Sequence, residues 1–297
     1  MAYSNITDPS AYFQIALYTG TGNQNKAVVN DGNSDLQPDM VWMKSRDAGH
    51  SHYIVDSSRG RDKGLYPDGD NAEVTASTSA KDLQSFDTDG FTVGEPEDAN
   101  STNSSSSTKV AWQWKSGGGT TASNTDGDIT STVQVNQTAG FSIVTYTGNT
   151  SNNQTVGHGL GAVPGVILIR NRQRAESWRW NHRAINNGTG MIIMNSTSAY
   201  NTTGTTLMNS AATSSVFNVS TDWSVNGNYP FVAWCWAEKQ GYSKFGKYVG
   251  NGASQSSPNT NGPFIYTGFS PAFVIIKKTS AVDDWLIFDN KRAGYDP

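Results

Sequence analysis

The chain repeats its own sequence on the scale of a domain. Four short segments return in the same order: Phe13–Gly20 as Phe141–Gly148, Pro38–Lys44 as Pro164–Arg170, Phe91–Val93 as Phe217–Val219, and Val110–Trp114 as Val232–Trp236. The copies are 122 residues apart between Trp112 and Trp234, and 128 apart between Tyr18 and Tyr146. Solenoid units are only about 20–50 residues long. Each copy therefore corresponds to a whole domain.

A third copy begins near Phe245, where Pro271–Lys277 repeats Pro38–Lys44 again, but the copies of Phe91–Val93 and Val110–Trp114 do not follow. We predict an N-terminal arm (1–11), a first repeat (12–118), a linker with the first strand of the next repeat (119–138), a second repeat (139–241), and the beginning of a third, incomplete repeat (242–297). A sandwich lacking strands leaves free edges and an open core. We expect either a chain that continues past Pro297 or completion by a neighbouring chain.

Short apolar runs between turn residues predict strands throughout. Met40–Met43 is almost continuously apolar, and Tyr53–Val55 follows it after a turn at Ala48–Gly49, which is typical of a hairpin. In Val110–Trp114 apolar residues alternate with other residues, so Val110, Trp112 and Trp114 share one face. No long window has helical spacing. The fold class predicted is all-β, with tandem antiparallel jelly-roll β-sandwiches and few or no long helices.

Composition excludes several classes of protein. Charged residues make up 15% of the chain and its net charge is −4, so a nucleic-acid partner is not expected. No apolar run is long enough to insert into a membrane, and the first residues do not resemble a signal peptide. The single cysteine, Cys235, lies between two tryptophans. We expect a buried, unreactive thiol and no intrachain disulfide.

Three polar segments are interpreted as exposed connections. Glu95–Ser107 is predicted to be a solvated loop, and 116–128 a flexible linker because it is rich in glycine and threonine. In the second repeat the first of these shortens to Ser224–Tyr229, where Asn226–Gly227 predicts a tight hairpin turn.

Groups that could carry chemistry are sparse. Asp87 with Asp89, and Asp126 with Asp128, offer too few oxygen ligands for calcium, so we expect structural turns and no metal site. The four histidines lack the further ligands that zinc needs, and we expect them to pack or to form hydrogen bonds: His50, His52, His158 and His182. The one Glu-x-Glu pair, Glu95 and Glu97, lies in a polar loop, so no glycosidase, catalytic residue or cofactor is predicted.

The aromatic residues allow two interpretations. Trp112, Trp114, Trp234 and Trp236 occupy equal positions in the two repeats, so they are predicted to form the core that both share. Trp223 and Tyr229 flank the predicted turn. There they could stack on a sugar ring while Asn226 and Asn228 hydrogen-bond its hydroxyls, although plain packing is the simpler alternative.

The repeated segments also resemble a known family. Phe141–Gly148, Val156–Leu160, Phe86–Phe91, Val232–Trp236 and Gly262–Phe269 are similar to segments of marine tailed-phage virion proteins. These are described as tail-fibre or structural proteins with repeated concanavalin-like, lectin-type β-sandwich domains. The resemblance extends from about Tyr12 along nearly the whole chain. It implies a similar fold for this chain, transfers no functional residue, and implies continuation beyond residue 297.

The sequence therefore predicts a virion structural protein that is not an enzyme and belongs to a tail fibre or other host-contacting appendage, made in the host cytoplasm. It would bind surfaces, including a host cell-surface glycan, through many weak contacts in a homo-oligomer, with a trimer favoured. Other virion proteins are expected partners, and the arm 1–11 could dock on one of them. The alternatives are a capsid decoration protein and a polysaccharide-degrading tailspike-type enzyme.

Overall fold

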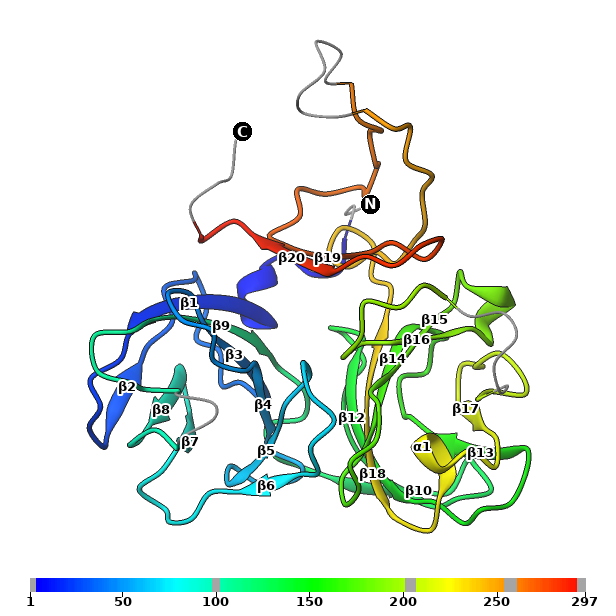
Figure 1. Ribbon diagram of the computed structural model, residues 1–297, viewed down its shortest axis with the longest axis horizontal. Helices are drawn as coiled ribbons and strands as arrows, with labels where there is room; N and C mark the ends of the chain where they lie inside the picture. Colours follow the sequence, from blue (N-terminus) through cyan, green and yellow to red (C-terminus); the bar gives the residue numbers. More distant parts are fainter. Residues whose placement is uncertain (1–3, 98–101, 201–206, 254–260, 293–297) are drawn as a thin grey trace.

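The computed structural model describes residues 4–97, 102–200, 207–253 and 261–292. Within them the protein is built almost entirely of antiparallel β-strands, which confirms the predicted all-β sandwich fold. Figure 1 shows the first repeat on one side and the second on the other, with a hairpin of the third lying across both.

The first repeat has a six-stranded sheet, in the order β1-β9-β3-β4-β5-β6, and a three-stranded sheet, β2-β8-β7. Its strands are β1 (Phe13–Thr19), β2 (Lys26–Val28), β3 (Met40–Ser45), β4 (Tyr53–Asp56), β5 (Lys63–Leu65), β6 (Val74–Thr75), β7 (Leu83–Asp87), β8 (Gly90–Val93) and β9 (Thr108–Trp114). A 3-10 turn, η1 (Pro9–Ala11), precedes them and is capped by the Asp8 carboxylate. Asp8 also accepts a hydrogen bond from Ser34, so this part of the arm is attached to the repeat.

The second repeat has a seven-stranded sheet, in the order β10-β11-β12-β18-β14-β15-β16, and a two-stranded sheet, β13-β17. Its elements are β10 (Ala122–Asn124), β11 (Ser131–Asn136), β12 (Phe141–Thr147), β13 (Gln154–Gly157), β14 (Pro164–Asn171), β15 (Arg179–His182), η2 (Asn186–Gly188), β16 (Met191–Ile193), β17 (Val216–Val219), α1 (Trp223–Asn226) and β18 (Pro230–Ala237). In the described part of the third unit, β19 (Phe273–Lys277) pairs with β20 (Trp285–Asp289).

The repeats share strand topology and register. In the first, β9 lies between β1 and β3, with Trp112 opposite Trp42. In the second, β18 lies between β12 and β14, with Trp234 opposite Leu168. The hairpin predicted between Met40–Met43 and Tyr53–Val55 is confirmed by the pairing of β3 with β4.

The tryptophans predicted for the shared core pack in a different place, where Trp112, Trp114 and Trp234 are buried and Trp236 is half-buried. One face of each large sheet packs on the small sheet of its own repeat and forms a separate core. The other faces of the two large sheets pack against each other, and this face of β9 and β18 carries Trp112 and Trp234. The alternation along β9 assigned these residues to one face correctly, but that face lies in the interface between the repeats.

Two expectations about connections are wrong. The segment 116–128 is not a flexible linker, because the amides of Gly118 and Gly119 donate to the buried Asp39 carboxylate and β10 joins the large sheet. The Glu95–Ser107 loop is not wholly solvated. Residues 98–101 lie outside the described residues, but Asn103 is fully buried and its amide donates to the carbonyl oxygens of Asn23 and Gly94.

Candidate functional site

Trp223 and Tyr229, two of the residues predicted to bind a glycan, lie together on the surface of the second repeat. Their ring centroids are 5.8 Å apart, and Trp223 is 52% exposed. The predicted hairpin turn at Asn226–Gly227 is wrong. The segment instead forms α1, whose N-terminus is capped by the Asp222 carboxylate. Such a turn needs positive φ at both central residues, whereas Gly227 has φ −57°.

Arg174 completes this cluster, which we call the Trp223 cluster (Arg174, Trp223, Tyr229). Its guanidinium carbon lies 5.3 Å from the centre of the Trp223 ring and 5.5 Å from that of Tyr229. Sequence reasoning missed Arg174 because it comes from the loop after β14, far from α1 along the chain. The cluster offers two aromatic faces and a cation, a combination that can stack on a sugar and donate hydrogen bonds to its oxygens.

The two asparagines predicted for this site differ in role. Asn226 is fully buried, and its amide donates to the carbonyl oxygen of Ser151 at 2.7 Å. Its side-chain oxygen accepts from the backbone of Asn149. Asn226 therefore fastens the loop and is turned away from any ligand on the surface. Asn228 is exposed next to Tyr229 and remains available to such a ligand.

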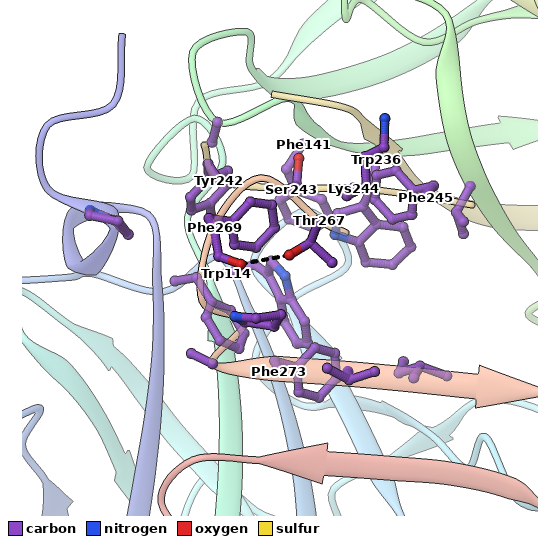
Figure 2. Close-up of a pocket in the computed structure, with 18 of the residues that line it drawn as sticks. Trp114, Phe141, Trp236, Tyr242, Ser243, Lys244, Phe245, Thr267, Phe269 and Phe273 are labelled. Atoms are coloured by element: carbon purple, nitrogen blue, oxygen red, sulfur yellow. Dashed lines mark hydrogen bonds between the residues drawn. The ribbon is translucent and has the colours of Figure 1, made fainter. Parts of the chain in front are cut away.

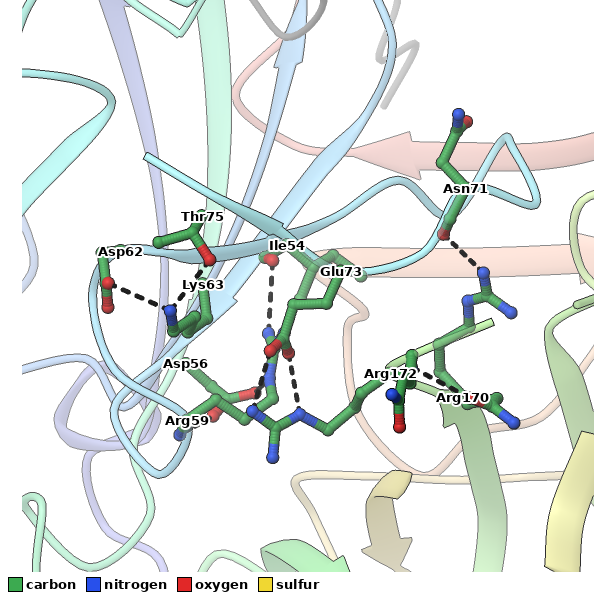
Figure 3. A network of polar contacts seen from close by, with 12 residues as sticks. Ile54, Asp56, Arg59, Asp62, Lys63, Asn71, Glu73, Thr75, Arg170 and Arg172 are labelled. Atoms are coloured by element: carbon green, nitrogen blue, oxygen red, sulfur yellow. Dashed lines mark hydrogen bonds and ion pairs between the residues drawn. The ribbon is translucent and has the colours of Figure 1, made fainter. Parts of the chain in front are cut away.

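A polar network joins the two repeats at the edge of the tryptophan interface (Figure 3). Glu73 accepts hydrogen bonds from Arg59 of its own repeat and from Arg172 of the second repeat, each at 2.8 Å. Arg59 also pairs with Asp56 at 2.6 Å, and Asp56 in turn accepts from the indole of Trp234 at 3.1 Å. The network satisfies charged groups that the packed sheets withdraw from water.

Burial raises the pKa of the Glu73 carboxyl, but the hydrogen bond from Arg172 and the positive charges of Arg59 and Arg172 outweigh it and leave the pKa below its usual value. Near the same interface, burial lowers the pKa of Arg170 to about 10, so that side chain is still charged at neutral pH. Arg170 donates to the carbonyl oxygens of Asp70 and Asn71 in the first repeat. This edge is a charged fastening between the repeats.

An apolar cavity of about 480 Å³ lies where both large sheets meet the third unit (Figure 2). Aromatic rings from all three units line it, among them Trp114, Phe141, Trp236 and Phe273. The rings of Phe141 and Trp236 are stacked at 5.2 Å, and Trp114 lies edge-on to Phe273 at 5.6 Å. Such a cavity can hold apolar or aromatic side chains.

Three of the four histidine rings form hydrogen bonds within the fold, and His50 accepts one from Lys44 through its backbone carbonyl. His52 accepts from the indole of Trp42 at 2.9 Å, and burial, together with the charges of Lys44 and Arg292, lowers its pKa to about 3. Nδ1 of His158 accepts from the amide of Leu160, and Nδ1 of His182 accepts from that of Ala184. Among the described residues no group of three or more histidine, cysteine or acidic side chains is placed to hold a metal ion.

The remaining acidic candidates and the cysteine are also structural in their contacts. Asp87 accepts from Ser85 and Thr92, and Asp128 accepts from the backbone and hydroxyl of Thr155. Cys235 is buried in β18, and burial raises the pKa of its thiol well above the usual range. In the described part of the chain, no helix has the length and apolar character to cross a membrane.

Comparison with known proteins identifies one family. A family model described as "Domain of unknown function (DUF7483)" matches residues 8–297. No curated protein and no solved structure gives a significant match. The match covers both repeats and the third unit, and the chain therefore belongs to the DUF7483 family.

Proposed function

We propose that this protein is a structural and binding component of a phage virion, in a tail fibre or another host-contacting appendage. The resemblance of its repeated segments to tail-fibre proteins supports the place in the virion. The Trp223 cluster supports the binding role, because a large aromatic side chain is exposed beside a second ring and a guanidinium. Burying such a ring against a ligand is favourable, and we therefore assign the contact surface to this cluster.

The ligand we propose is a glycan of the host cell surface. Carbohydrate rings have an apolar face that stacks on indole and phenol rings, and hydroxyls that accept hydrogen bonds from a guanidinium or an amide. Trp223 and Tyr229 would supply the stacking surfaces, with Arg174 and Asn228 as polar partners. One cluster of this size binds weakly, so affinity would come from several copies acting together in a homo-oligomer, for which we propose a trimer.

Trp223→Ala tests the glycan site. We expect a loss of binding to host cells and to surface polysaccharide extracted from them, by about tenfold or more per site, because the main stacking surface is removed. Val163→Ala is the matched control, because Val163 is an exposed apolar residue in the same repeat, 44% accessible, and should leave binding unchanged. Equal binding by wild type and Trp223→Ala would overturn the glycan proposal.

The place in the virion needs a separate measurement. Antibodies against the purified protein, applied to intact particles and viewed by electron microscopy, should label the tail or its fibres. Labelling of the head would favour a capsid decoration protein, and particles without label would contradict a virion role. Release of sugars from host polysaccharide by the purified protein would instead favour the tailspike-type enzyme.

A further inference from the structure

The contacts between repeats follow a rule that runs from one unit to the next. Trp234 of the second repeat donates its indole N–H to Asp56 of the first, at 3.1 Å. Trp112 of the first repeat donates in the same way to Asp289 of the third unit, at 3.0 Å. Strand pairing shows that Asp56 and Asp289 are equivalent, because they lie opposite Met40 and Phe273 at the starts of β3 and β19. Each carboxylate is followed three residues later by an arginine whose guanidinium covers the same indole ring.

A second set of contacts follows the same order. Trp178 of the second repeat donates to the carbonyl oxygens of Tyr66 and Gly69, in the loop after β5 of the first repeat. Trp285 of the third unit donates to those of Ile193 and Ser196, at the end of β16 and after it in the second repeat. The three units are therefore arranged cyclically, first to second, second to third, and third back to first.

Among the described residues, the contact between the second repeat and the third unit lacks the hydrogen bond from tryptophan to aspartate that the other two contacts have. The residue equivalent to Asp56 and Asp289 is His182, which lies opposite Val166 on β14. In the other two contacts, the residue at this position accepts a hydrogen bond from a tryptophan of β9 or β18. Within the described residues, β19 pairs with β20 alone, whereas β3 and β14 each also pair with such a tryptophan-bearing strand.

A groove lies beside β19, at the place where β9 and β18 pack in the other two repeats. The third unit's equivalent of β1 and β12 begins at Phe245, and Phe245 lines a hollow together with Phe273 and Ile275 of β19. Tyr248 lines a second hollow with Ile276, whose side chain lies on the opposite face of β19 from Ile275. His182 and Trp180 border the first hollow. In the complete repeats, β9 and β18 lie between the equivalents of these two walls.

The outer face of this hairpin is also apolar and open. Leu286 and Phe288 are 48% and 53% exposed, whereas their equivalents in the first repeat, Tyr53 and Val55, are 0% exposed beneath the small sheet. β19 is half-buried along its whole length, whereas β14 is fully buried. β19 thus has the sequence of a central strand but the exposure of an edge strand. An edge strand has free backbone groups that can pair with another strand.

We propose that the groove between residues 245–253 and β19 is the docking site for a β-strand of the β9 and β18 type, with the sequence pattern Val-Ala-Trp-X-Trp. The strand would run antiparallel to β19. By analogy with the other repeats, its first tryptophan would lie opposite Ile275 and its second opposite Phe273. The backbone would complete the ladder of β19, and the alternating apolar side chains would fill the aromatic cavity.

His182 is placed so that its ring cannot accept a hydrogen bond from a docked tryptophan. Its Nδ1 accepts a hydrogen bond from the amide of Ala184, so in the neutral ring Nε2 carries the proton and cannot accept from an indole. A tryptophan arriving there would lack the carboxylate acceptor that Trp112 and Trp234 have. Replacing His182 with aspartate would supply the carboxylate acceptor of the other two contacts, although Ile185 stands where they have an arginine.

The test uses the full chain and a fluorescent peptide with the sequence of residues 108–115, Thr-Lys-Val-Ala-Trp-Gln-Trp-Lys. Fluorescence anisotropy should show saturable 1:1 binding, and a peptide with both tryptophans replaced by alanine should bind at least about tenfold more weakly. Ile275→Lys, in the groove, should abolish binding, and Val282→Lys, at a 70% exposed position between β19 and β20, should preserve it. Each variant is first checked for native circular dichroism.

His182→Asp should bind the tryptophan peptide about tenfold more tightly than wild type, because a charge-assisted hydrogen bond is added. His182→Ala should give no such gain. This gain does not depend on the Ile275→Lys variant folding. Equal binding of the alanine peptide, or binding unchanged by both Ile275→Lys and His182→Asp, would overturn the proposal. Self-association of the chain that Ile275→Lys abolishes and the peptide cannot displace would also overturn it, because a second copy would then cover the groove.

Discussion

Glu73 couples the two repeats directly. It receives guanidinium groups from both of them, and its backbone amide donates to the carbonyl oxygen of Arg172 across the same interface. The sequence offered no signal for this role. Glu73 lies in a polar stretch of the first repeat, and Arg172 follows a strand of the second, about a hundred residues later. A long-range pair of this kind is decided by how the sheets pack.

We expect the Glu73 carboxylate to make stability dependent on pH. Because its pKa is depressed in the folded protein, its contribution is fully present above the unfolded value of about 4.5 and is lost as the pH falls through the folded pKa. Glu73→Gln should therefore cost about 3 kcal/mol of unfolding free energy at pH 7. The difference from wild type should shrink below about pH 4.5. Denaturant unfolding at several pH values measures both effects.

Asp62→Asn is the matched control for this prediction. Asp62 pairs with Lys63 at 3.3 Å, but its side chain is 41% exposed. Surface pairs contribute only about 0–1 kcal/mol, so this variant should unfold almost as wild type at every pH. A Glu73→Gln variant as stable as Asp62→Asn at pH 7 would contradict the coupling role of Glu73.

The Trp223 cluster shows how much of the candidate site could be predicted from residues alone. Trp223 and Tyr229 are close in sequence, and their rings lie together in the structure, while their role in glycan binding stays a prediction. The place of Asn226 was not predictable, because its burial follows from the capped helix α1 and from the loop at Asn149–Ser151 that packs on it. Arg174 became visible only once the loop after β14 was placed beside α1.

At the scale of elements, repeated sequence predicted the strands well and their neighbours less well. Each repeated segment forms a strand in both complete repeats, because apolar alternation fixes which residues face inward. The alternation cannot say whether a buried face meets a small sheet or another repeat. For that reason the tryptophans of β9 and β18 were assigned to the core of each sandwich, when they belong to the interface between sandwiches.

Substitution of Gly90 tests the turn between β7 and β8, which was predicted from the sequence Asp87–Gly90. The glycine has φ +96°, and a Cβ there would lie 2.0 Å from the carbonyl oxygen of Val28. Gly90→Ala should therefore lose at least about 1–3 kcal/mol of unfolding free energy. Gly49→Ala is the control, because no atom lies within 4 Å of a Cβ at that position. Similar stability of the two variants in thermal unfolding would contradict this account of the turn.

Asp56 and Asp289, whose carboxylates accept hydrogen bonds from tryptophan, allow the stability of two interfaces to be compared. Asp56 lies between the first and second repeats, and Asp289 between the third unit and the first repeat. Asp56→Ala leaves the fully buried guanidinium of Arg59 without its closest partner, and we expect a cost of about 3–5 kcal/mol. Asp289→Ala affects Arg292, whose side chain is 27% exposed and can reach water. Its cost should be smaller, about 1–2 kcal/mol. A larger loss of unfolding free energy for Asp289→Ala would contradict the view that the first and second repeats form the tighter interface.

At the scale of the whole molecule, the two repeats are joined by a shared apolar interface and are not independent domains. The interface cluster draws on both large sheets and on β19. Tryptophan rings from different repeats meet there, such as Trp114 and Trp236 at 6.1 Å. Within one chain, the cyclic order of contacts resembles what a homotrimer achieves with three chains. Whether the chain itself also forms a trimer is tested by its mass in light scattering, where our proposal expects three times the monomer value.

Differential scanning calorimetry of wild type and Asp56→Ala tests the shared interior most directly. If the two repeats form one cooperative unit, wild type should show a single transition for both, with equal calorimetric and van't Hoff enthalpies, and any separate smaller peak should belong to the third unit. Asp56→Ala should move that whole transition to lower temperature. Two large transitions in wild type, or a variant that shifts only one of them, would contradict the account.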